Sequence, residues 1–194
     1  MRGCRPMTDE EISEVSRSFW GEHARRDKAL FLLGVKSGFR ISELLSLRLK
    51  DVLQSGRIVD RVSIERRYMK KKIEGRTVLL HPEAKAALVD WLQELADLGY
   101  STADSYVFQS RKGANRSITR VQAYRILKEA CDSCEMTGKL GTHSMRKSFA
   151  NKIYDKLGGD LIKTQRALGH RNINSTVQYL SFREEEIDEA ILAL

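Results

Sequence analysis

One β-type stretch in an otherwise helical sequence most constrains what this chain can fold into. Residues 57–80 read RIVDRVSIERRYMKKKIEGRTVLL. Polar and β-prone residues alternate, the pattern breaks at a charged turn before Gly75, and it resumes as RTVLL. This predicts two or three antiparallel strands with a lysine-rich hairpin tip. Because helical patterns dominate elsewhere, the sequence predicts an α+β fold that is mainly helical, with a small antiparallel sheet and a β-hairpin.

Helix boundaries can be placed from local residue chemistry. Thr8 stands three residues before a glutamate, which is capping-box spacing, and acidic residues fill the first turn. A second, largely buried helix is predicted over 24–38 and should stop at Gly38. The leucine-rich stretch 41–52 predicts a short turn or helix against the core. Pro82 suits the first turn of the helix that follows the strands.

The segment SITRVQAYRILKEACDSC has helical spacing, and from residue 141 onward we expect three or four short helices. One face of the helix predicted within SITRVQAYRILKEACDSC should carry Ile118, Val121, Tyr124, Leu127 and Cys131. Its two cysteines, Cys131 and Cys134, also raise a metal-site interpretation. Zinc needs about four ligands, and no second Cys or His pair has matching spacing. We therefore interpret both cysteines as packing residues and expect neither metal nor cofactor.

Composition narrows the class of partner. The 194 residues suit a single domain, and the formal net charge of +8 with a pI of about 9.5 fits a polyanion, most often nucleic acid. No apolar run is long enough to span a bilayer, and no signal peptide opens the chain. Three cysteines are an odd number, which argues against a secreted disulfide framework. We therefore expect a reducing, cytoplasmic compartment.

Four short stretches could carry chemistry: SGFRISELL, MKKKIEGR, GTHSMRKSFA and LGHRNINSTVQYL. Each alone has an ordinary explanation, namely a surface arginine, a lysine-protected strand edge, a surface pair on a helix and a packed tyrosine. Their order and spacing together resemble the tyrosine recombinase (phage integrase) family over nearly the whole chain. The positions that match the family's catalytic set are Arg40, Lys71, His143, Arg146, His170 and Tyr179.

The chemistry of a phosphodiester explains why two arginines belong in such a set. The diester carries a full negative charge, and more charge gathers on its non-bridging oxygens in the transition state. Arg40 and Arg146 can each hold those oxygens with paired N–H groups and stay protonated. This is the electrostatic role that metals fill in other phosphoryl transfers, so the mechanism requires no metal.

The resemblance implies roles for the remaining groups. Tyr179 attacks phosphorus and forms a 3′-phosphotyrosyl link, and His143 accepts the phenolic proton. A hairpin lysine protonates the leaving 5′-hydroxyl. His170 hydrogen-bonds the phosphate and helps to seat the nucleophile, and Glu43 orients an arginine or histidine without reacting. One diester is exchanged for another, so no ATP is needed.

The lysine cannot be assigned uniquely from the sequence. Counting back from RTV favours Lys71, but a bulge would bring Lys70 or Lys72 to the same face. Lys70, Lys72, Arg76 and Lys147 are expected to contact DNA. Lys147 stands where the family often has histidine.

We expect one catalytic domain over 1–194, with a core at about 8–182. The acidic helix 183–194 could dock on its own domain or pack in trans on a neighbouring protomer. Family members usually place a helical core-binding domain before the catalytic domain, and we expect this chain to lack one, either as an isolated catalytic fragment or as a natural minimal protein. In both cases we expect it to bind DNA weakly. The resemblance implies double-stranded DNA as partner, a monomer alone, a tetramer on recombining DNA, and accessory DNA-bending proteins as further partners. It also implies a cytoplasmic, nucleoid-associated protein of bacterial or phage origin.

The function implied is site-specific DNA recombination, as integration or excision. One alternative is a type IB topoisomerase, which uses much the same chemistry to relax supercoils. A second is a non-catalytic DNA-binding protein that keeps the fold, although every expected reactive side chain is present. A helical transcription regulator would need a recognition helix, and none stands out.

Overall fold

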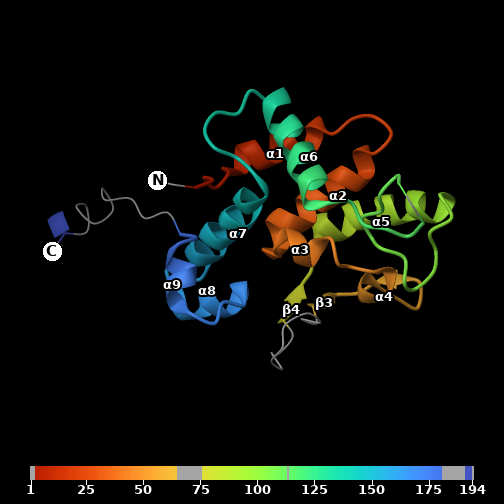
Figure 1. The fold of residues 1–194 in the computed structure, drawn as a ribbon. Helices are drawn as coiled ribbons and strands as arrows, with labels where there is room; N and C mark the ends of the chain where they lie inside the picture. The colour runs from red at the N-terminus through yellow and green to blue at the C-terminus, as the bar shows by residue number, and fades with distance from the viewer. Residues whose placement is uncertain (1–2, 65–75, 113, 181–190, 194) are drawn as a thin grey trace. The chain divides into compact units, whose positions relative to one another are not determined.

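The computed structural model describes residues 3–64, 76–112, 114–180 and 191–193. The chain divides into two compact units, an N-terminal unit that ends at Phe149 and a C-terminal unit that begins at Ala150. Helices of the N-terminal unit are α1 (Asp9–Ser18), α2 (Ala24–Ser37), α3 (Ile41–Leu44), α4 (Leu49–Val52), α5 (Pro82–Asp97) and α6 (Arg120–Ser133). The boundary between the units falls within α7 (Thr142–Lys156), and α8 (Leu161–Leu168) and α9 (Ile173–Val177) follow it (Figure 1).

The strands form two small antiparallel sheets, and the mainly helical α+β prediction is confirmed. The strands are β1 (Leu53–Gln54), β2 (Arg57–Ile58), β3 (Arg61–Ile64) and β4 (Arg76–Leu79). β3 pairs with β4 as the sequence predicts, whereas the β1–β2 pair forms a separate sheet. Its two-residue loop, Ser55–Gly56, has positive φ at both positions, which is the geometry of a tight hairpin.

Local chemistry sets several boundaries as predicted. Thr8 caps α1, and the Glu11 side chain accepts a hydrogen bond from the Thr8 backbone N–H, which completes the capping box. Gly38 caps α2 with a left-handed φ of 61°. Pro82 is the first residue of α5.

The core of the N-terminal unit forms where α2 packs on α5 (Figure 1). Leu33 of α2 and Leu88 of α5 are completely buried, and Trp91 is 1% exposed. The Trp91 indole donates to the Val107 carbonyl at 2.7 Å, so its polar atom is satisfied in the core. This packing fixes the C-terminal end of α2, from which the Arg40 turn continues.

The predicted face of α6 is confirmed at Leu127 and Cys131, which are buried, and wrong at Val121 and Tyr124. Val121 is 59% exposed and Tyr124 is 46% exposed, whereas the buried residues of the helix are Ala123, Ile126, Leu127, Ala130 and Cys131. Ile118 is buried, but it precedes the N-cap and therefore does not set the helical phase. Two of these five buried residues are alanines, so small side chains form part of the packed stripe.

Both cysteines of α6 pack as predicted. Cys131 belongs to the core, and Cys134 packs against it from the end of the helix. Burial raises the pKa of the Cys131 thiol to about 11. Because the thiolate is the form that binds metals or attacks, this thiol is suited to packing.

Hydrogen bonds join the segment before α1 to the loop before α7 and to α7 itself. The Arg5 guanidinium donates to both carboxylate oxygens of Glu11, at 2.7 and 2.5 Å, and to the Thr137 carbonyl at 2.7 Å. The hydrogen bond from Arg5 lowers the pKa of Glu11. The Met7 backbone N–H donates to Ser148 Oγ at 2.7 Å. These bonds hold the helix that carries the candidate catalytic residues His143 and Arg146.

Among the described residues, none of the helices combines the length and apolarity needed to cross a membrane.

Candidate active site

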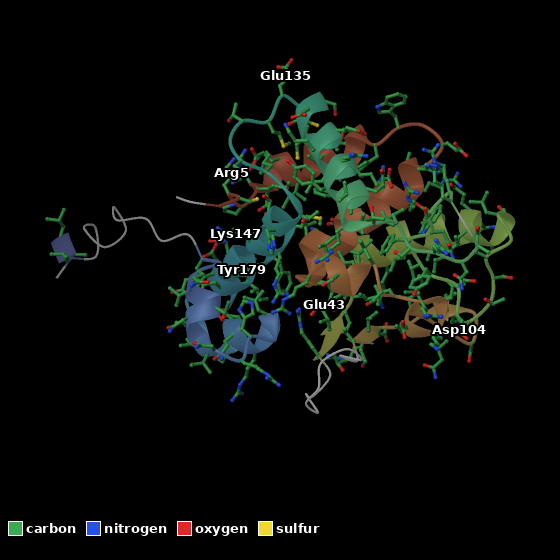
Figure 2. All side chains as sticks on the ribbon, in the orientation of Figure 1. Arg5, Glu43, Asp104, Glu135, Lys147 and Tyr179 are labelled. Carbon is green, nitrogen blue, oxygen red and sulfur yellow. The ribbon has the colours of Figure 1, made fainter. Side chains whose placement is uncertain are left out.

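Arg40 lies in the short turn between α2 and α3 and is the N-cap of α3. Its backbone N–H donates to Glu43 Oε2 at 2.7 Å, and its Nη1 donates to Glu43 Oε1 at 2.9 Å. Glu43, labelled on α3 in Figure 2, thus binds both ends of the same arginine. The Arg40 side chain is 34% exposed, so its guanidinium can reach a ligand. The orienting role of Glu43 in the reaction stays a prediction.

His143 and Arg146 lie in the first two turns of α7. Ser144 supports this helix start, because Gly141 N–H donates to Ser144 Oγ at 3.1 Å. His143 is exposed, whereas Arg146 is 1% exposed and its Nη1 donates to the Gly38 carbonyl. Within the N-terminal unit, Arg146 therefore meets the turn that leads to Arg40. The N-terminal end of a 15-residue helix also favours a nearby anion.

Arg76 contacts the same turn from the first position of β4. Its Nη2 donates to the Ser37 carbonyl at 2.6 Å, and its Nη1 donates to the Gly38 carbonyl at 3.3 Å. Its guanidinium carbon lies 5.4 Å from the centre of the Phe39 ring. The sequence predicts Arg76 only as a DNA contact, and these carbonyl bonds give it a second role to test.

His170 and Tyr179 lie together in the C-terminal unit. Their ring centroids are 5.2 Å apart with the planes tilted by 52°. His170 is 8% exposed, and its Nδ1 lies 3.0 Å from Oγ1 of the buried Thr176. Tyr179, labelled in Figure 2, follows α9 and is half-buried. Asn151 Nδ2 donates to the Tyr179 carbonyl at 3.1 Å.

Three residues that support this pair are not predicted from the sequence. Thr176 fixes the His170 ring, Asn151 holds the Tyr179 backbone, and Gln165 Nε2 donates to the His170 carbonyl at 3.0 Å. Of the three, only Thr176 lies within one of the four stretches singled out from the sequence, LGHRNINSTVQYL. The other two act through backbone carbonyls, which leave no residue-type pattern.

The structure thus groups the candidate residues within each unit. The N-terminal unit holds Arg40, Glu43, His143 and Arg146, and the C-terminal unit holds His170 and Tyr179. Lys147 is half-buried on α7. Lys70, Lys71 and Lys72 lie outside the described residues, as does most of the predicted C-terminal helix 183–194.

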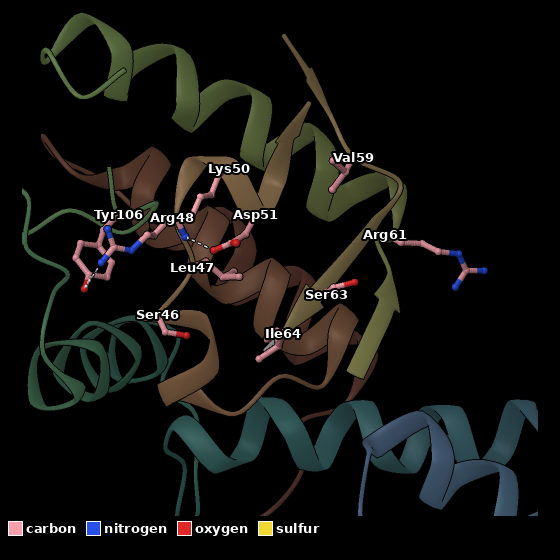
Figure 3. Close-up of a pocket in the computed structure, with 10 residues that line it drawn as sticks. All are labelled: Ser46, Leu47, Arg48, Lys50, Asp51, Val59, Arg61, Ser63, Ile64 and Tyr106. Carbon is pink, nitrogen blue, oxygen red and sulfur yellow. Dashed lines mark hydrogen bonds between the residues drawn. The ribbon is translucent and has the colours of Figure 1, made fainter. Parts of the chain in front are cut away.

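A separate hollow of about 600 Å³ lies in the N-terminal unit, between α4 and β3 (Figure 3). Arg48 stacks on Tyr106 there, 4.7 Å from the ring centre, and its backbone N–H donates to Asp51 at 2.8 Å. Asp104 forms ion pairs with both neighbouring cations, because its Oδ1 lies 2.6 Å from Lys50 Nζ and 3.5 Å from Arg48 Nη1. Among the described residues that line this hollow, none belongs to the predicted catalytic set. We therefore do not assign the reaction to it.

Gly38 is the backbone position on which the Arg40 turn depends. A Cβ at this residue would overlap the Phe149 ring, and its left-handed φ is unfavourable for other residues. We expect Gly38→Ala to lower the free energy of unfolding by about 2–4 kcal/mol, through backbone strain and displaced packing. Gly56→Ala is the matched control, because Gly56 has φ 74° but open space at its Cβ. It should cost about 1 kcal/mol. Equal losses in urea denaturation would refute the packing argument.

Comparison with known proteins decides the family. The sequence model of the phage integrase family matches residues 7–186. The chain belongs to the phage integrase family. The probable integrase/recombinase YoeC of Bacillus subtilis (strain 168) is 31% identical over 176 residues, which are 91% of this chain and 88% of YoeC. The tyrosine recombinase XerC of Myxococcus xanthus is 32% identical, over 84% of this chain and 53% of XerC.

A solved structure agrees with the family assignment. The XerH site-specific recombinase, bound to the palindromic difH substrate after cleavage, superposes with a TM-score of 0.75 and 25% identity. The match covers 96% of this chain and 51% of the XerH chain. This phage integrase family member therefore spans about half the length of XerC and of XerH. The resemblance to the tyrosine recombinase (phage integrase) family that the sequence motifs indicate is confirmed.

Proposed function

We propose that this chain cleaves and rejoins double-stranded DNA, with Tyr179 as nucleophile, and so carries out site-specific recombination. The observation that carries the proposal is the pairing of Tyr179 with His170. The Tyr179 ring lies beside the imidazole of His170, which Thr176 holds in place, so a group able to bind a phosphate oxygen stands next to the phenol. The net charge of +8 supports a DNA partner, as does the DNA-bound state of XerH.

In the proposed cleavage step, Tyr179 Oη attacks phosphorus and the bond from phosphorus to the 5′ oxygen breaks. His143, which is exposed at the start of α7, accepts the phenolic proton. Lys71 gives a proton to the leaving 5′ oxygen. Arg40, Arg146 and His170 bind the non-bridging oxygens, where negative charge accumulates. Attack by a 5′-hydroxyl reverses the step and releases the tyrosine, so the number of diester bonds is conserved.

The partner strand distinguishes recombination from relaxation. When the 5′-hydroxyl comes from a second DNA the product is recombinant, and when it is the original one the strand is only relaxed.

We propose a monomer in isolation and a tetramer on recombining DNA, with Lys70, Lys72 and Lys147 on the DNA backbone. Binding should then weaken steeply as salt rises.

The test uses the intact chain and a suicide substrate whose 5′-hydroxyl fragment diffuses away after cleavage. We expect a covalent protein–DNA adduct, and peptide mass spectrometry should place the modification on the peptide that contains Tyr179. Two labelled DNAs in the same reaction should give joined products. An adduct on another residue would overturn the nucleophile assignment, and relaxation without joining would favour the topoisomerase alternative.

A further inference from the structure

We propose that Arg76 is a positioning residue that holds the turn carrying Arg40 in its reactive place. The inference rests on the proposed function, since it concerns the same reaction. Arg76 donates to two successive carbonyls, Ser37 O at 2.6 Å and Gly38 O at 3.3 Å. Ser37 ends α2 and Gly38 caps it. Carbonyls at a helix C-terminus carry partial negative charge, so a cation is favoured there.

The contacts continue along the turn toward Arg40. The Arg76 guanidinium lies over the ring of Phe39, which is only 2% exposed. Arg76 therefore touches three consecutive residues that directly precede Arg40 in the chain. A guanidinium can make these contacts at once because its planar fork donates in two directions and its face stacks on a ring. No single ammonium has that geometry.

Arg76 is itself fixed by the β3–β4 sheet. Its backbone pairs with Ile64, at the end of the ladder that runs to Arg61 opposite Leu79. The side chain thus links a strand to the end of a helix far away in sequence. Because the turn leads directly to Arg40, the bonds of Arg76 help to fix the position of the Arg40 backbone at the start of α3.

The second catalytic arginine shares the same anchor. Arg146 Nη1 donates to the Gly38 carbonyl that Arg76 also binds. The Gly38 oxygen therefore accepts hydrogen bonds from both Arg76 and Arg146. Because Gly38 also belongs to the turn that leads to Arg40, this oxygen relates the position of Arg40 to that of Arg146. If Arg76 were lost, the turn could shift relative to Arg146, and a displacement of about 1 Å at a reacting group can cost about 10²-fold in rate.

A DNA contact by Arg76 would have different consequences. An arginine that binds a backbone phosphate contributes to affinity and to the salt dependence of binding, and its loss reduces the salt slope by about one. A positioning residue instead affects the rate of the bound complex. The split between DNA affinity and saturated cleavage rate therefore separates the two roles.

The kinetic test compares Arg76→Gln with the matched control Arg61→Gln, an exposed arginine on the same sheet. We expect Arg76→Gln to slow single-turnover cleavage at saturating DNA by about 10- to 100-fold. The Kd for DNA should stay within about twofold and the salt slope should not change, because the lost bonds are internal. Arg61→Gln should leave the cleavage rate unchanged. An unchanged rate for Arg76→Gln, or a loss of affinity with a smaller salt slope, would overturn the proposal.

A double-mutant cycle sharpens the comparison. If Arg76 acts through Arg40, then Arg76→Gln should cost little in an Arg40→Lys background. Fully additive losses would show that the two residues act independently. Should Arg76→Gln fold too poorly to assay, Arg76→Lys carries the same test, because it keeps the charge but cannot bind both carbonyls and the ring.

Amide hydrogen exchange tests the positioning role without any cleavage. The Glu43 and Leu44 N–H groups donate to the Arg40 carbonyl at 2.8 and 3.0 Å, so they report on the start of α3. We expect faster exchange at both amides in Arg76→Gln and unchanged exchange in Arg61→Gln. Wild-type exchange rates in Arg76→Gln would refute the proposal even if the protein cleaves DNA. A wild-type chain that does not cleave would instead refute the proposed function and leave the exchange result decisive for Arg76.

Discussion

Tyr179→Phe is expected to abolish the covalent adduct on a suicide substrate while DNA binding persists. The substitution removes one oxygen, and phenylalanine has no nucleophilic atom to replace it. Loss of a nucleophile typically lowers turnover by roughly 10⁴- to 10⁶-fold, which is below detection in a gel assay. The phenyl ring that remains can keep its contact with His170, so the C-terminal unit should stay folded. The measurement is denaturing gel electrophoresis of the trapped complex, with DNA affinity determined separately.

Tyr154→Phe is the matched control for that experiment. Tyr154 lies on α7 in the same unit, is also half-buried, and has its hydroxyl 3.5 Å from the space that a Cβ on Gly159 would occupy. Its removal should leave the adduct intact. An adduct that survives in Tyr179→Phe, or one that disappears in Tyr154→Phe, would move the nucleophile to another residue.

Features that depend on a few neighbouring residues are the ones the sequence predicts well. The Thr8 capping box and the Gly38 stop both follow from chemistry within one helical turn. The β3–β4 pairing follows from alternation on both sides of a charged turn. The motifs also identify the family correctly. Each motif marks a local turn or helix, and the order of the four motifs along the chain is specific to this family.

Features that depend on tertiary packing are harder to predict. On α6, Val121 and Tyr124 look apolar enough for the core, yet the buried stripe includes small alanines instead. The hydrophobic periodicity of a sequence shows which residues are apolar. It does not show how closely a neighbouring element packs against the helix. The bonds from Arg76 to Ser37 and Gly38 likewise join segments almost forty residues apart. They depend on side-chain reach, which no spacing rule contains.

Arg146 also bonds to a residue far away in sequence, and this contact bears on the proposed chemistry. It is almost fully buried, and one of its nitrogens is bonded to the Gly38 carbonyl. A guanidinium has five N–H donors in a fixed plane, so it can bind the turn with one edge and present other donors to a phosphate. Lysine has one nitrogen at the end of a flexible chain. It can replace the charge at this position but not both sets of directed contacts.

Arg146→Lys is therefore expected to slow cleavage at saturating DNA by about 10²- to 10³-fold, or roughly 3–4 kcal/mol in barrier, as when an oxyanion donor is removed. The variant keeps a cation, so thermal unfolding should show that it still folds cooperatively. Arg17→Lys is the control, because Arg17 is exposed on α1 and donates to the Ser13 carbonyl of its own helix. It should cleave at the wild-type rate. If Arg146→Lys cleaves as fast as Arg17→Lys, charge alone suffices at this position and the forked contact has no role in the reaction.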